Sequence, residues 1–542
     1  MNNFFKKTQK LILSQQGSIF SSALLISMMI IISRLFGFLR YRILSSFFNK
    51  EELDIFFASF RIPDLIFEIL ISGALSSAFI PLVIKYQKDK EKFSQNISSI
   101  INFIILTMLF LIILISVFID WIIPLITPGY PIEKNQQIIF LSRFLLLGQL
   151  PFLILGNFLI AFAQAYKVFI LTTIAPILYN ITIILFTIIF ANKIHLLGPI
   201  LGVMVGAMIF FISQLPIIFK INFSYQLILK KTEGLINFLK IVIPRVLTVI
   251  TAQIDATIDL ILTTFLGSGR YTAFYLAQHL QLLPVSVIGM ALGQASLPYL
   301  TESYQQGKIE EFRKIIINSI LNIFFLTIPI SSFFIFARTP LTRLFFGGEK
   351  FDWEATILTA YTLSCFCISL PFHSIYYFLT RCFYAFLDSK TPFYISVLSI
   401  ILNTLLSLFF IFILHLPVWS LALSFSLSMI FNVVLMLIAL RKKIVRLEFL
   451  YIFWETFKIS VASLIASFFS YYFMKILDIL ILDTTRTINI FFLLMMVGSL
   501  FSLLYLFLSW VLAIKEISFL VYFIIKAKEY RRKIIEIYNQ NL

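Results

Sequence analysis

Long apolar runs, separated by short polar or basic stretches, recur along the whole chain. Many of these runs are about 18 residues or longer, which is enough for a helix to cross a hydrocarbon core of about 30 Å. The short alternating segments that are typical of membrane β-barrel strands do not occur. The pattern therefore predicts an all-α polytopic membrane protein with about 14 transmembrane helices, at residues 19–47, 53–84, 97–126, 138–163, 170–191, 197–219, 241–266, 271–299, 314–337, 355–384, 392–414, 417–440, 453–477 and 487–514.

The composition of the 542 residues agrees with this interpretation. Hydrophobic residues make up 60% of the chain and charged residues only 13%, whereas about 25% is usual for soluble domains. No Walker A loop, dinucleotide-binding glycine motif, zinc motif or nucleophile elbow occurs, so we expect neither an ATPase nor a hydrolase. The three cysteines, Cys365, Cys367 and Cys382, lie in or beside one apolar segment and are expected to act as small apolar residues rather than as metal ligands.

The positive charge is distributed unevenly between the two sides of the predicted membrane protein. Of the 43 Lys and Arg residues, 26 lie in the connections on the side of the two termini and only eight in those on the other side. Because cytoplasmic loops carry the excess of basic residues, both termini are predicted to be cytoplasmic. The net charge of +17 is then explained by topology and by contact with anionic lipids, and no nucleic-acid partner is expected.

A weak internal repeat divides the chain. ALSSAFIPLVIKYQ (74–87) and ALGQASLPYLTESY (291–304) share the pattern A-L-x-x-A-x-x-P. The first six helices and the next six are then two lobes related by a parallel repeat, a common transporter plan. We expect an N-terminal lobe at 1–222, an amphipathic linker and C-terminal lobe at 223–440, and two further helices with a basic cytoplasmic tail at 441–542.

The first two helices contain charged residues that are unusual inside a membrane. Arg34 and Arg40 lie in the first helix, whereas Arg61 lies in the second together with three acids, Asp54, Asp64 and Glu68. A charge at the centre of a membrane helix costs about 2.5–3.5 kcal/mol on insertion scales. Two explanations remain open: structural ion pairs between these residues, or a cationic cavity for an anionic substrate. Arginine suits a phosphate group because its planar fork donates two parallel hydrogen bonds.

The same two helices contain residues that permit bends. Gly37 interrupts the first helix, and Pro63 and Gly73 interrupt the second. Bends of this kind are expected where helices line a cavity. For Gly37, close packing against a neighbouring helix is the alternative explanation.

The seventh helix carries charge of the opposite sign. Asp255 and Asp259 are four residues apart and share a helix face, which predicts a site for a cation or a proton, with Asn403 of the eleventh helix as a further oxygen ligand. A salt bridge to the first or eighth helix is the alternative. His279 in the eighth helix lies close to the repeat equivalent of Arg61, and is either a second cationic contact or an ordinary packed histidine.

Three motifs resemble a known family. SRLFGFLR (33–40), DIFFASFRIPDL (54–65) and LPVSVIGMALGQASLPYL (283–300) are similar to sequences of the MurJ (MviN) lipid II flippases. The resemblance covers the first twelve helices and implies the two-lobed fold of the multidrug/oligosaccharide-lipid/polysaccharide exporters. It also implies that Arg34 and Arg40 are cavity residues that bind the substrate, and that Asp54 is the functional acid of the second helix.

The chain departs from this family at several positions. The family often has an arginine pair where this chain has Phe67 and Glu68, an acid where it has Ser72, and an arginine where it has His279. The predicted cavity is therefore less cationic than the family pattern, and Arg61 is expected to compensate.

Together these observations predict a transporter rather than an enzyme. We expect a lipid II flippase of the bacterial plasma membrane that works by alternating access, without a cofactor, and is driven by a coupling monovalent cation or by the membrane potential. Expected partners are lipid II, anionic lipids and cell-wall synthesis proteins. The alternatives are a related exporter of polysaccharide-lipid or drugs, and a non-transporting scaffold for cell-wall synthesis. A drug exporter is expected to have an acidic, aromatic cavity, whereas the first helix here carries only basic charges.

Overall fold

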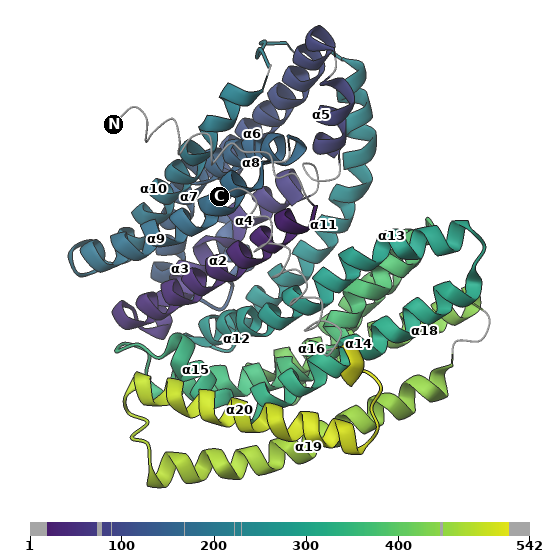
Figure 1. Ribbon diagram of the computed structural model, residues 1–542. Helices are drawn as coiled ribbons and strands as arrows, with labels where there is room; N and C mark the ends of the chain where they lie inside the picture. Colours follow the sequence, from purple (N-terminus) through teal and green to yellow (C-terminus); the bar gives the residue numbers. More distant parts are fainter. Residues whose placement is uncertain are drawn as a thin grey trace, which may run out of the picture. The chain divides into compact units, whose positions relative to one another are not determined.

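The computed structural model describes residues 19–519, apart from residues 73–77, 88, 167, 222, 229 and 445–447. The described residues form helices joined by short connections and contain no β-strand (Figure 1). The all-α fold class predicted from the sequence is therefore confirmed.

Contacts divide the chain into two compact units. The first comprises residues 1–272 and 345–355, and the second comprises residues 273–344 and 356–542. The predicted domain boundaries follow from the internal repeat rather than from contacts, and they stay predictions. The first unit contains α2 (Ile19–Phe47), α3 (Lys50–Ser59), α4 (Arg61–Phe67), η1 (Glu68–Ser72), α5 (Ile80–Tyr86), α6 (Lys90–Ile126), α7 (Ile132–Gly148), α8 (Leu150–Ala165), α9 (Phe169–Ile194), α10 (Leu197–Gln214), η3 (Leu215–Lys220) and α11 (Glu233–Phe265).

The second unit is also entirely helical in its described residues. Three of its helices, α12, α15 and α16, have one end in the residue ranges of the first unit. Its elements are α12 (Arg270–Pro284), η4 (Val285–Met290), α13 (Ala291–Gln305), α14 (Ile309–Phe336), α15 (Arg338–Phe346), α16 (Trp353–Ala385), α17 (Lys390–Leu408), η5 (Phe409–Ile413), α18 (Trp419–Lys443), α19 (Phe449–Leu480) and α20 (Thr487–Val511).

In their described residues, the fourteen predicted segments all coincide with helices. Eleven helical segments among the described residues are long and apolar enough to cross a membrane. The remaining three predicted segments correspond to α2, to the interrupted helix formed by α3, α4, η1 and α5, and to α11. The chain is therefore a multi-pass membrane protein.

The second predicted helix is broken at Phe60, between α3 and α4. Pro63 explains the break because proline has no N–H to donate to the carbonyl four residues earlier, which is that of Ser59. The Ser142 hydroxyl of α7 donates to that carbonyl instead, at 2.9 Å. The break is thus stabilised by a neighbouring helix, and it precedes the π-helical turn η1.

The connection between α10 and α11 differs from the prediction. Residues 223–240 are predicted to be an amphipathic linker, but α11 already begins at Glu233, where Thr232 caps its first turn. The preceding connection is held along α6 by polar side chains. Ser99 and Asn102 donate to the carbonyls of Lys230, Gln226 and Ile228, and the Ser98 hydroxyl accepts from the N–H of Gln226.

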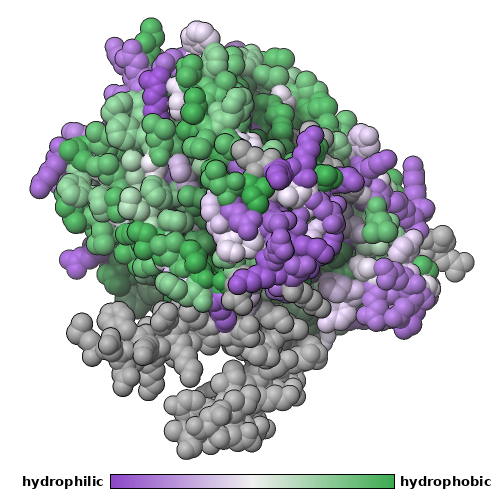
Figure 2. All heavy atoms as spheres, turned by 90° about the horizontal axis from the view of Figure 1, so that it is seen from above, coloured by the Kyte–Doolittle hydropathy of each residue, from purple (hydrophilic) through white to green (hydrophobic). Residues whose placement is uncertain are grey.

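Helix α6 shows how the membrane determines surface composition. Its 37 residues extend about 55 Å at 1.5 Å per residue, nearly twice a hydrocarbon core of about 30 Å. Its exposed apolar side chains have the character of a lipid-facing surface, and they are Phe103, Leu106, Leu109, Phe110, Ile113, Leu114, Val117, Phe118, Trp121 and Leu125. Figure 2 shows apolar residues over much of the visible face, with hydrophilic residues gathered into separate patches.

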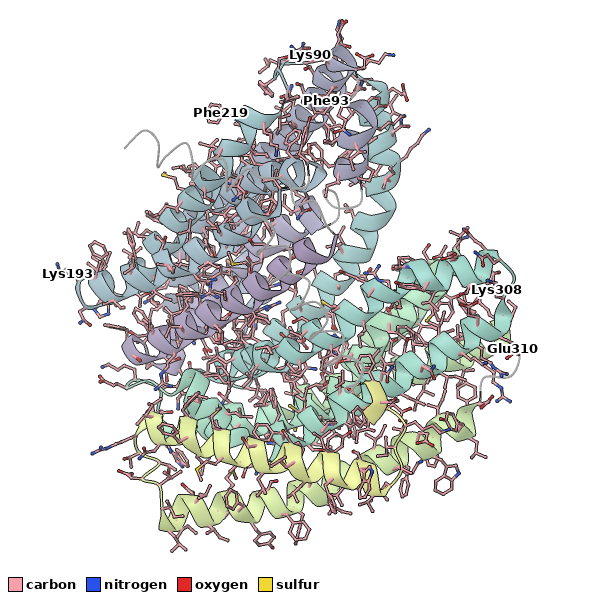
Figure 3. The ribbon with its side chains drawn as sticks, in the orientation of Figure 1. Lys90, Phe93, Lys193, Phe219, Lys308 and Glu310 are labelled. Atoms are coloured by element: carbon pink, nitrogen blue, oxygen red, sulfur yellow. The ribbon has the colours of Figure 1, made fainter. Side chains whose placement is uncertain are left out.

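Charged residues gather where helices begin and end. Lys90 begins α6, Lys193 lies in the last turn of α9, and Lys308 and Glu310 flank the start of α14 (Figure 3). This placement is expected when the middle of each helix crosses hydrocarbon.

In the second unit, α19 and α20 lie side by side (Figure 1). Both also contact α14. The Ser463 hydroxyl of α19 donates to Ser332 at 2.9 Å, and the Tyr505 hydroxyl of α20 donates to the carbonyl of Phe325 at 2.8 Å. The two C-terminal helices are therefore packed into the second unit through α14.

Candidate functional site

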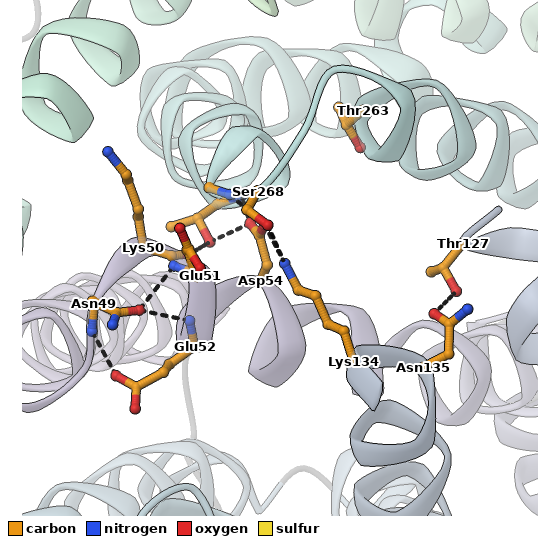
Figure 4. Close-up of polar contacts among 12 residues, drawn as sticks. Asn49, Lys50, Glu51, Glu52, Asp54, Thr127, Lys134, Asn135, Thr263 and Ser268 are labelled. Carbon is orange, nitrogen blue, oxygen red and sulfur yellow. Dashed lines mark hydrogen bonds and ion pairs between the residues drawn. The ribbon is translucent and has the colours of Figure 1, made fainter. Parts of the chain in front are cut away.

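The first turn of α3 is fixed by a reciprocal cap. The Asn49 side-chain oxygen accepts hydrogen bonds from the N–H groups of Glu51 and Glu52, at 3.0 and 2.9 Å (Figure 4). The Glu52 carboxylate accepts one from the N–H of Asn49 at 2.9 Å. This capping box satisfies amides that the first helical turn leaves without partners. It fixes where α3 begins and therefore the position of Asp54 one turn later.

Asp54 is completely buried, and both of its oxygens have protein partners. Oδ2 accepts from Lys134 Nζ at 3.0 Å and from the N–H of Gly269 at 2.6 Å. Oδ1 accepts from the N–H of Thr272 at 2.7 Å, and the Thr272 hydroxyl lies 2.8 Å away. The carboxylate therefore caps the N-terminus of α12, where the helix dipole favours negative charge, and joins it to α3 and α7.

The turn before α12 requires glycine. Gly267 and Gly269 have φ values of +104° and +79°, in the left-handed region that favours glycine. A Cβ atom at Gly269 would also lie 2.7 Å from Lys50 Cγ. The turn can thus approach α3 closely enough for the Gly269 amide to reach Asp54.

A second ionic cluster lies at the start of α3. Lys50 Nζ is 3.1 Å from Asp352 and 2.6 Å from Glu354, and Arg270 is 3.4 Å from Glu354. The two acids are more than half exposed, so solvent screens the pairs and each contributes little alone. Together the pairs attach residues 345–355 to the start of α3.

Arg40 and Arg61 both lie near the Asp64 carboxylate, with which each interacts electrostatically. Glu68 adds a second acid to this group, and the Arg40 guanidinium also stacks over the Tyr41 ring at 4.7 Å. Arg40, Arg61, Asp64 and Glu68 therefore form one mixed cluster rather than a set of isolated charges.

The Arg61 guanidinium is bonded to α11. Its Nε donates to the Thr257 hydroxyl oxygen at 3.1 Å, and its Nη2 donates to the backbone and side-chain oxygens of Gln253 at 2.6 and 2.8 Å. The sequence left open an ion pair of Arg61 with Asp64 or Glu68. Among the described residues, neither acid forms an ion pair with Arg61 within 4 Å. Its direct partners are instead neutral groups.

Asp259 is buried, with 3% of its surface exposed, and its Oδ1 atom has no hydrogen-bond partner among the described residues. Its carboxylate interacts electrostatically with Asp255 and with Arg61. Arg61, in the second predicted helix, is therefore one basic neighbour of Asp259, and the alternative of a salt bridge to the first or eighth helix stays a prediction. An isolated buried carboxylate is costly, so a proton or cation at Asp259 is the physical expectation.

Arg34 lies near the middle of α2 and is exposed. Among the described residues it has no ion-pair partner within 4 Å. Gly37 is one turn further on, and a Cβ atom there would meet nothing within 4 Å. Close packing against another helix therefore does not explain this glycine, and its predicted role in bending stays a prediction.

The remaining predicted site residues are dispersed. His279 belongs to the second unit, where its Nδ1 lies 2.8 Å from the carbonyl of Tyr275 and its ring contacts the Tyr275 ring in a tilted arrangement. Asn403 is buried in α17 of the second unit, whereas Asp255 and Asp259 belong to the first. Gly73 lies outside the described residues. A site shared by Asp259 and Asn403 therefore stays a prediction.

Several residues of the cluster were not predicted from the sequence. Lys134, Thr257 and Thr272 all contact a predicted site residue, but none lies in a motif that marks it. Lys134 had one available signal, because it is a charged residue shortly after the P-G-Y-P turn at 128–131. No group of three or more His, Cys, Asp or Glu side chains suited to a metal ion occurs among the residues with assigned positions.

Comparisons with known proteins agree on one family. The profile of the family described as "Lipid II flippase MurJ" matches residues 43–498. A protein of Buchnera aphidicola subsp. Acyrthosiphon pisum, named "Probable lipid II flippase MurJ", is 31% identical over 450 residues, which is 79% of this chain and 86% of the relative. The "Lipid II flippase MurJ" of Burkholderia cenocepacia is 25% identical over 443 residues, which is 79% of this chain and 84% of that protein.

Solved structures give the same result. A structure titled "Lipid II flippase MurJ, inward closed conformation" superimposes with a TM-score of 0.74 at 25% identity, covering 90% of this chain and 98% of that one. An inward-facing MATE-family transporter of the MOP superfamily matches with a TM-score of 0.65 at 13% identity, covering 76% and 94%. The second likeness concerns the fold alone.

Proposed function

Because this chain belongs to the MurJ family of lipid II flippases, we propose that it moves lipid II, the undecaprenyl-pyrophosphate-linked peptidoglycan precursor, from the inner to the outer leaflet of the bacterial plasma membrane. The proposed mechanism is alternating access without covalent chemistry. The protein therefore acts as a transporter and not as an enzyme.

The observation that carries this proposal is Arg34. It is exposed near the middle of α2, the first predicted membrane helix, and no acid among the described residues pairs with it. A permanent charge at that depth is stable only beside water or an anion. A diphosphate head group supplies such an anion, and a guanidinium binds it with two parallel hydrogen bonds.

Arg40 and Arg61 extend the proposed anion site, with His279 as a further contact contributed by α12. Asp64 and Glu68 partly compensate the two arginines. The site therefore favours a diphosphate less strongly than three free arginines would. Asp54, whose oxygens are both engaged, fits a role in holding the α3–α12 connection better than direct contact with the substrate.

For the energy source we propose a monovalent cation or the membrane potential. Asp259, with Asp255 second and Asn403 as a proposed oxygen ligand, is the proposed coupling site, because its buried Oδ1 has no hydrogen-bond partner among the described residues. Gly37, Pro63 and Gly73 are the proposed hinges, and Pro63 is supported by the break at Phe60.

The proposed location is the bacterial inner membrane with both termini in the cytoplasm. Anionic lipids are proposed to contact the cytoplasmic lysines, and cell-wall synthesis proteins are proposed to use the transported product. The basic tail at 526–533 lies outside the described residues.

The test is a leaflet-resolved lipid II assay in cells depleted of their own flippase. Arg34→Ala is expected to lower flipping at least ten-fold at normal protein level, because a charge-assisted hydrogen bond contributes about 1.5–3 kcal/mol. Arg34→Lys should restore only part of the activity, since lysine lacks the bidentate fork. Arg143→Ala is the matched control, because Arg143 is an exposed partner of Asp120 in the same unit. Normal flipping by Arg34→Ala contradicts the proposed anion site.

A further inference from the structure

Arg61 is attached to a different helix from the one that carries it. Its three hydrogen bonds all go to α11, to Gln253 and Thr257, one helical turn apart. They use Nε and Nη2, while Nη1 has no hydrogen-bond partner among the described residues. The guanidinium is thus held along one edge, and its other edge remains available to a ligand.

The two residues of α11 that bind Arg61 are also hydrogen-bonded to each other. The Thr257 hydroxyl donates to the Gln253 carbonyl at 2.8 Å, so its lone pairs are directed away from that bond. Arg61 Nε donates to this hydroxyl oxygen, and Nη2 donates to the same Gln253 carbonyl. Two side chains and one backbone oxygen therefore fix both the position and the plane of the guanidinium.

Such fixation matters for binding an anion. A free arginine side chain loses about 2 kcal/mol of rotamer freedom when it is immobilised. A guanidinium already held by its own protein loses less on binding, so the same phosphate contact yields higher affinity. This is the expected arrangement for an arginine that compensates for missing neighbours, since the chain has Phe67 and Glu68 about two turns further along, where the resembled family often has an arginine pair.

We propose that Gln253 and Thr257 are positioning residues, which hold Arg61 so that its Nη1 edge binds a phosphate oxygen of the substrate. The inference rests on the proposed function, because it assigns the orientation of one residue of the same anion site. It also gives α11 a direct link to the bound anion. The acid of that helix, Asp259, interacts electrostatically with the same guanidinium.

The test measures binding of a prenyl pyrophosphate to the full-length protein in nanodiscs, with inorganic pyrophosphate as a parallel probe. Thr257→Val removes the hydroxyl and should weaken prenyl pyrophosphate binding about five- to ten-fold. Thr257→Ser keeps the hydroxyl and should restore wild-type affinity. Thr263→Val is the matched control, since Thr263 lies on α11 and its hydroxyl donates to the carbonyl of Leu260 within the same helix.

A double-mutant cycle separates positioning from a general effect on α11. In an Arg61→Ala background, Thr257→Val should cause no further loss, because the group that it positions is absent. An equal loss in both backgrounds overturns the inference and leaves Thr257 with a structural role only.

The remaining outcomes concern the probe and the proposed function. If inorganic pyrophosphate shows the same differences between variants, the site recognises the diphosphate itself. If only prenyl pyrophosphate shows these differences, the lipid chain contributes to the orientation of the diphosphate at Arg61. If wild-type protein binds neither probe, the proposed function fails. If it binds them but Thr257→Val has no effect, the inference alone fails.

Discussion

Asp54→Asn tests whether the buried carboxylate holds the start of α12. The substitution keeps the shape of the side chain but replaces one acceptor oxygen by an NH₂ donor. If the remaining oxygen stays near Thr272, the new NH₂ group faces Lys134 Nζ and the N–H of Gly269, which are both donors. Two charge-assisted bonds are lost and a nearly buried ammonium is left without its acid.

The size of the effect follows from these contacts. Hydrogen bonds to charged groups contribute about 1.5–3 kcal/mol each, and breaking a buried ion pair from one side costs about 3–5 kcal/mol. Lys134 keeps two weaker contacts, the Tyr130 ring at 3.9 Å and the Ser268 hydroxyl at 3.4 Å. We therefore expect a cost of about 3 kcal/mol, at the lower end of that range.

The assay is hydrogen exchange of the purified protein, followed at the amides of Gly269 and Thr272. Because local opening governs the exchange of such amides, loss of one charged acceptor should accelerate exchange about ten- to hundred-fold. Asp120→Asn is the matched control, since Asp120 forms an exposed pair with Arg143 and should leave these amides unchanged.

A second substitution tests the ion pair itself. In the Asp54→Asn background, Lys134→Met removes the unpaired ammonium. The double variant should be more stable than the sum of the single effects by about 1–3 kcal/mol. Unchanged exchange at Gly269 and Thr272, together with lost transport, would refute this reasoning and favour the sequence-based prediction that Asp54 contacts the substrate.

Two further predictions concern a loop and the topology. Asp388 accepts hydrogen bonds from Lys443 at 2.5 Å and from Thr391; burial acts to raise its pKa, but these bonds outweigh burial and lower the pKa to about 2. The stability that a lowered pKa provides is present above the unfolded pKa of 3.8 and is lost as pH falls toward 2. Asp388→Asn should therefore destabilise the protein by about 1–2 kcal/mol at pH 7, and thermal unfolding should show the same loss from pH 5 to 8. A loss that changes clearly across that pH range contradicts this prediction. Cysteines introduced at Lys308 and Lys350, in a background without native cysteines, should react with impermeant reagents from the cytoplasmic and the external side respectively, and labelling of both from one side refutes the predicted topology.

The membrane-crossing helices were predictable because lipid imposes a simple requirement. Backbone groups in hydrocarbon must bond within their own helix, so each span is a long apolar run. The prediction was least complete where this requirement is locally relaxed. The second helix breaks at Phe60 because Ser142 of another helix satisfies the freed carbonyl, and that partner is not visible from Pro63 alone.

The start of α11 illustrates a different reason for error. Hydropathy places the start of the helix near residue 241, but α11 begins at Glu233, after the Thr232 cap. A threonine followed by an acid and then by apolar residues is a start signal. The prediction nevertheless followed hydropathy and placed the helix start later, because the first turns of α11 also contain the polar residues Asn237 and Lys240.

The site was predictable in residue type but not in pairing. Intramembrane charges identify Arg34, Arg61 and Asp259 without any structure, because each is costly in hydrocarbon. The partners of Arg61 lie far away in the sequence, because it bonds to residues 192 and 196 positions later. Such long-range pairs follow from helix packing, which a single apolar pattern does not encode.

The two proposals together concern the balance between the arginines and the α11 acids. Arg34 is an exposed cation without an acid among its described neighbours, whereas Asp259 is a buried acid with one unpartnered oxygen. Arg61 interacts with Asp259 and is available to an anion along its Nη1 edge. An anion that binds Arg61 withdraws compensation from Asp259, which then binds a cation or proton more tightly. By linkage, the cation strengthens anion binding by the same factor. On the basis of the two proposals, we therefore propose cotransport of a diphosphate head group with a cation.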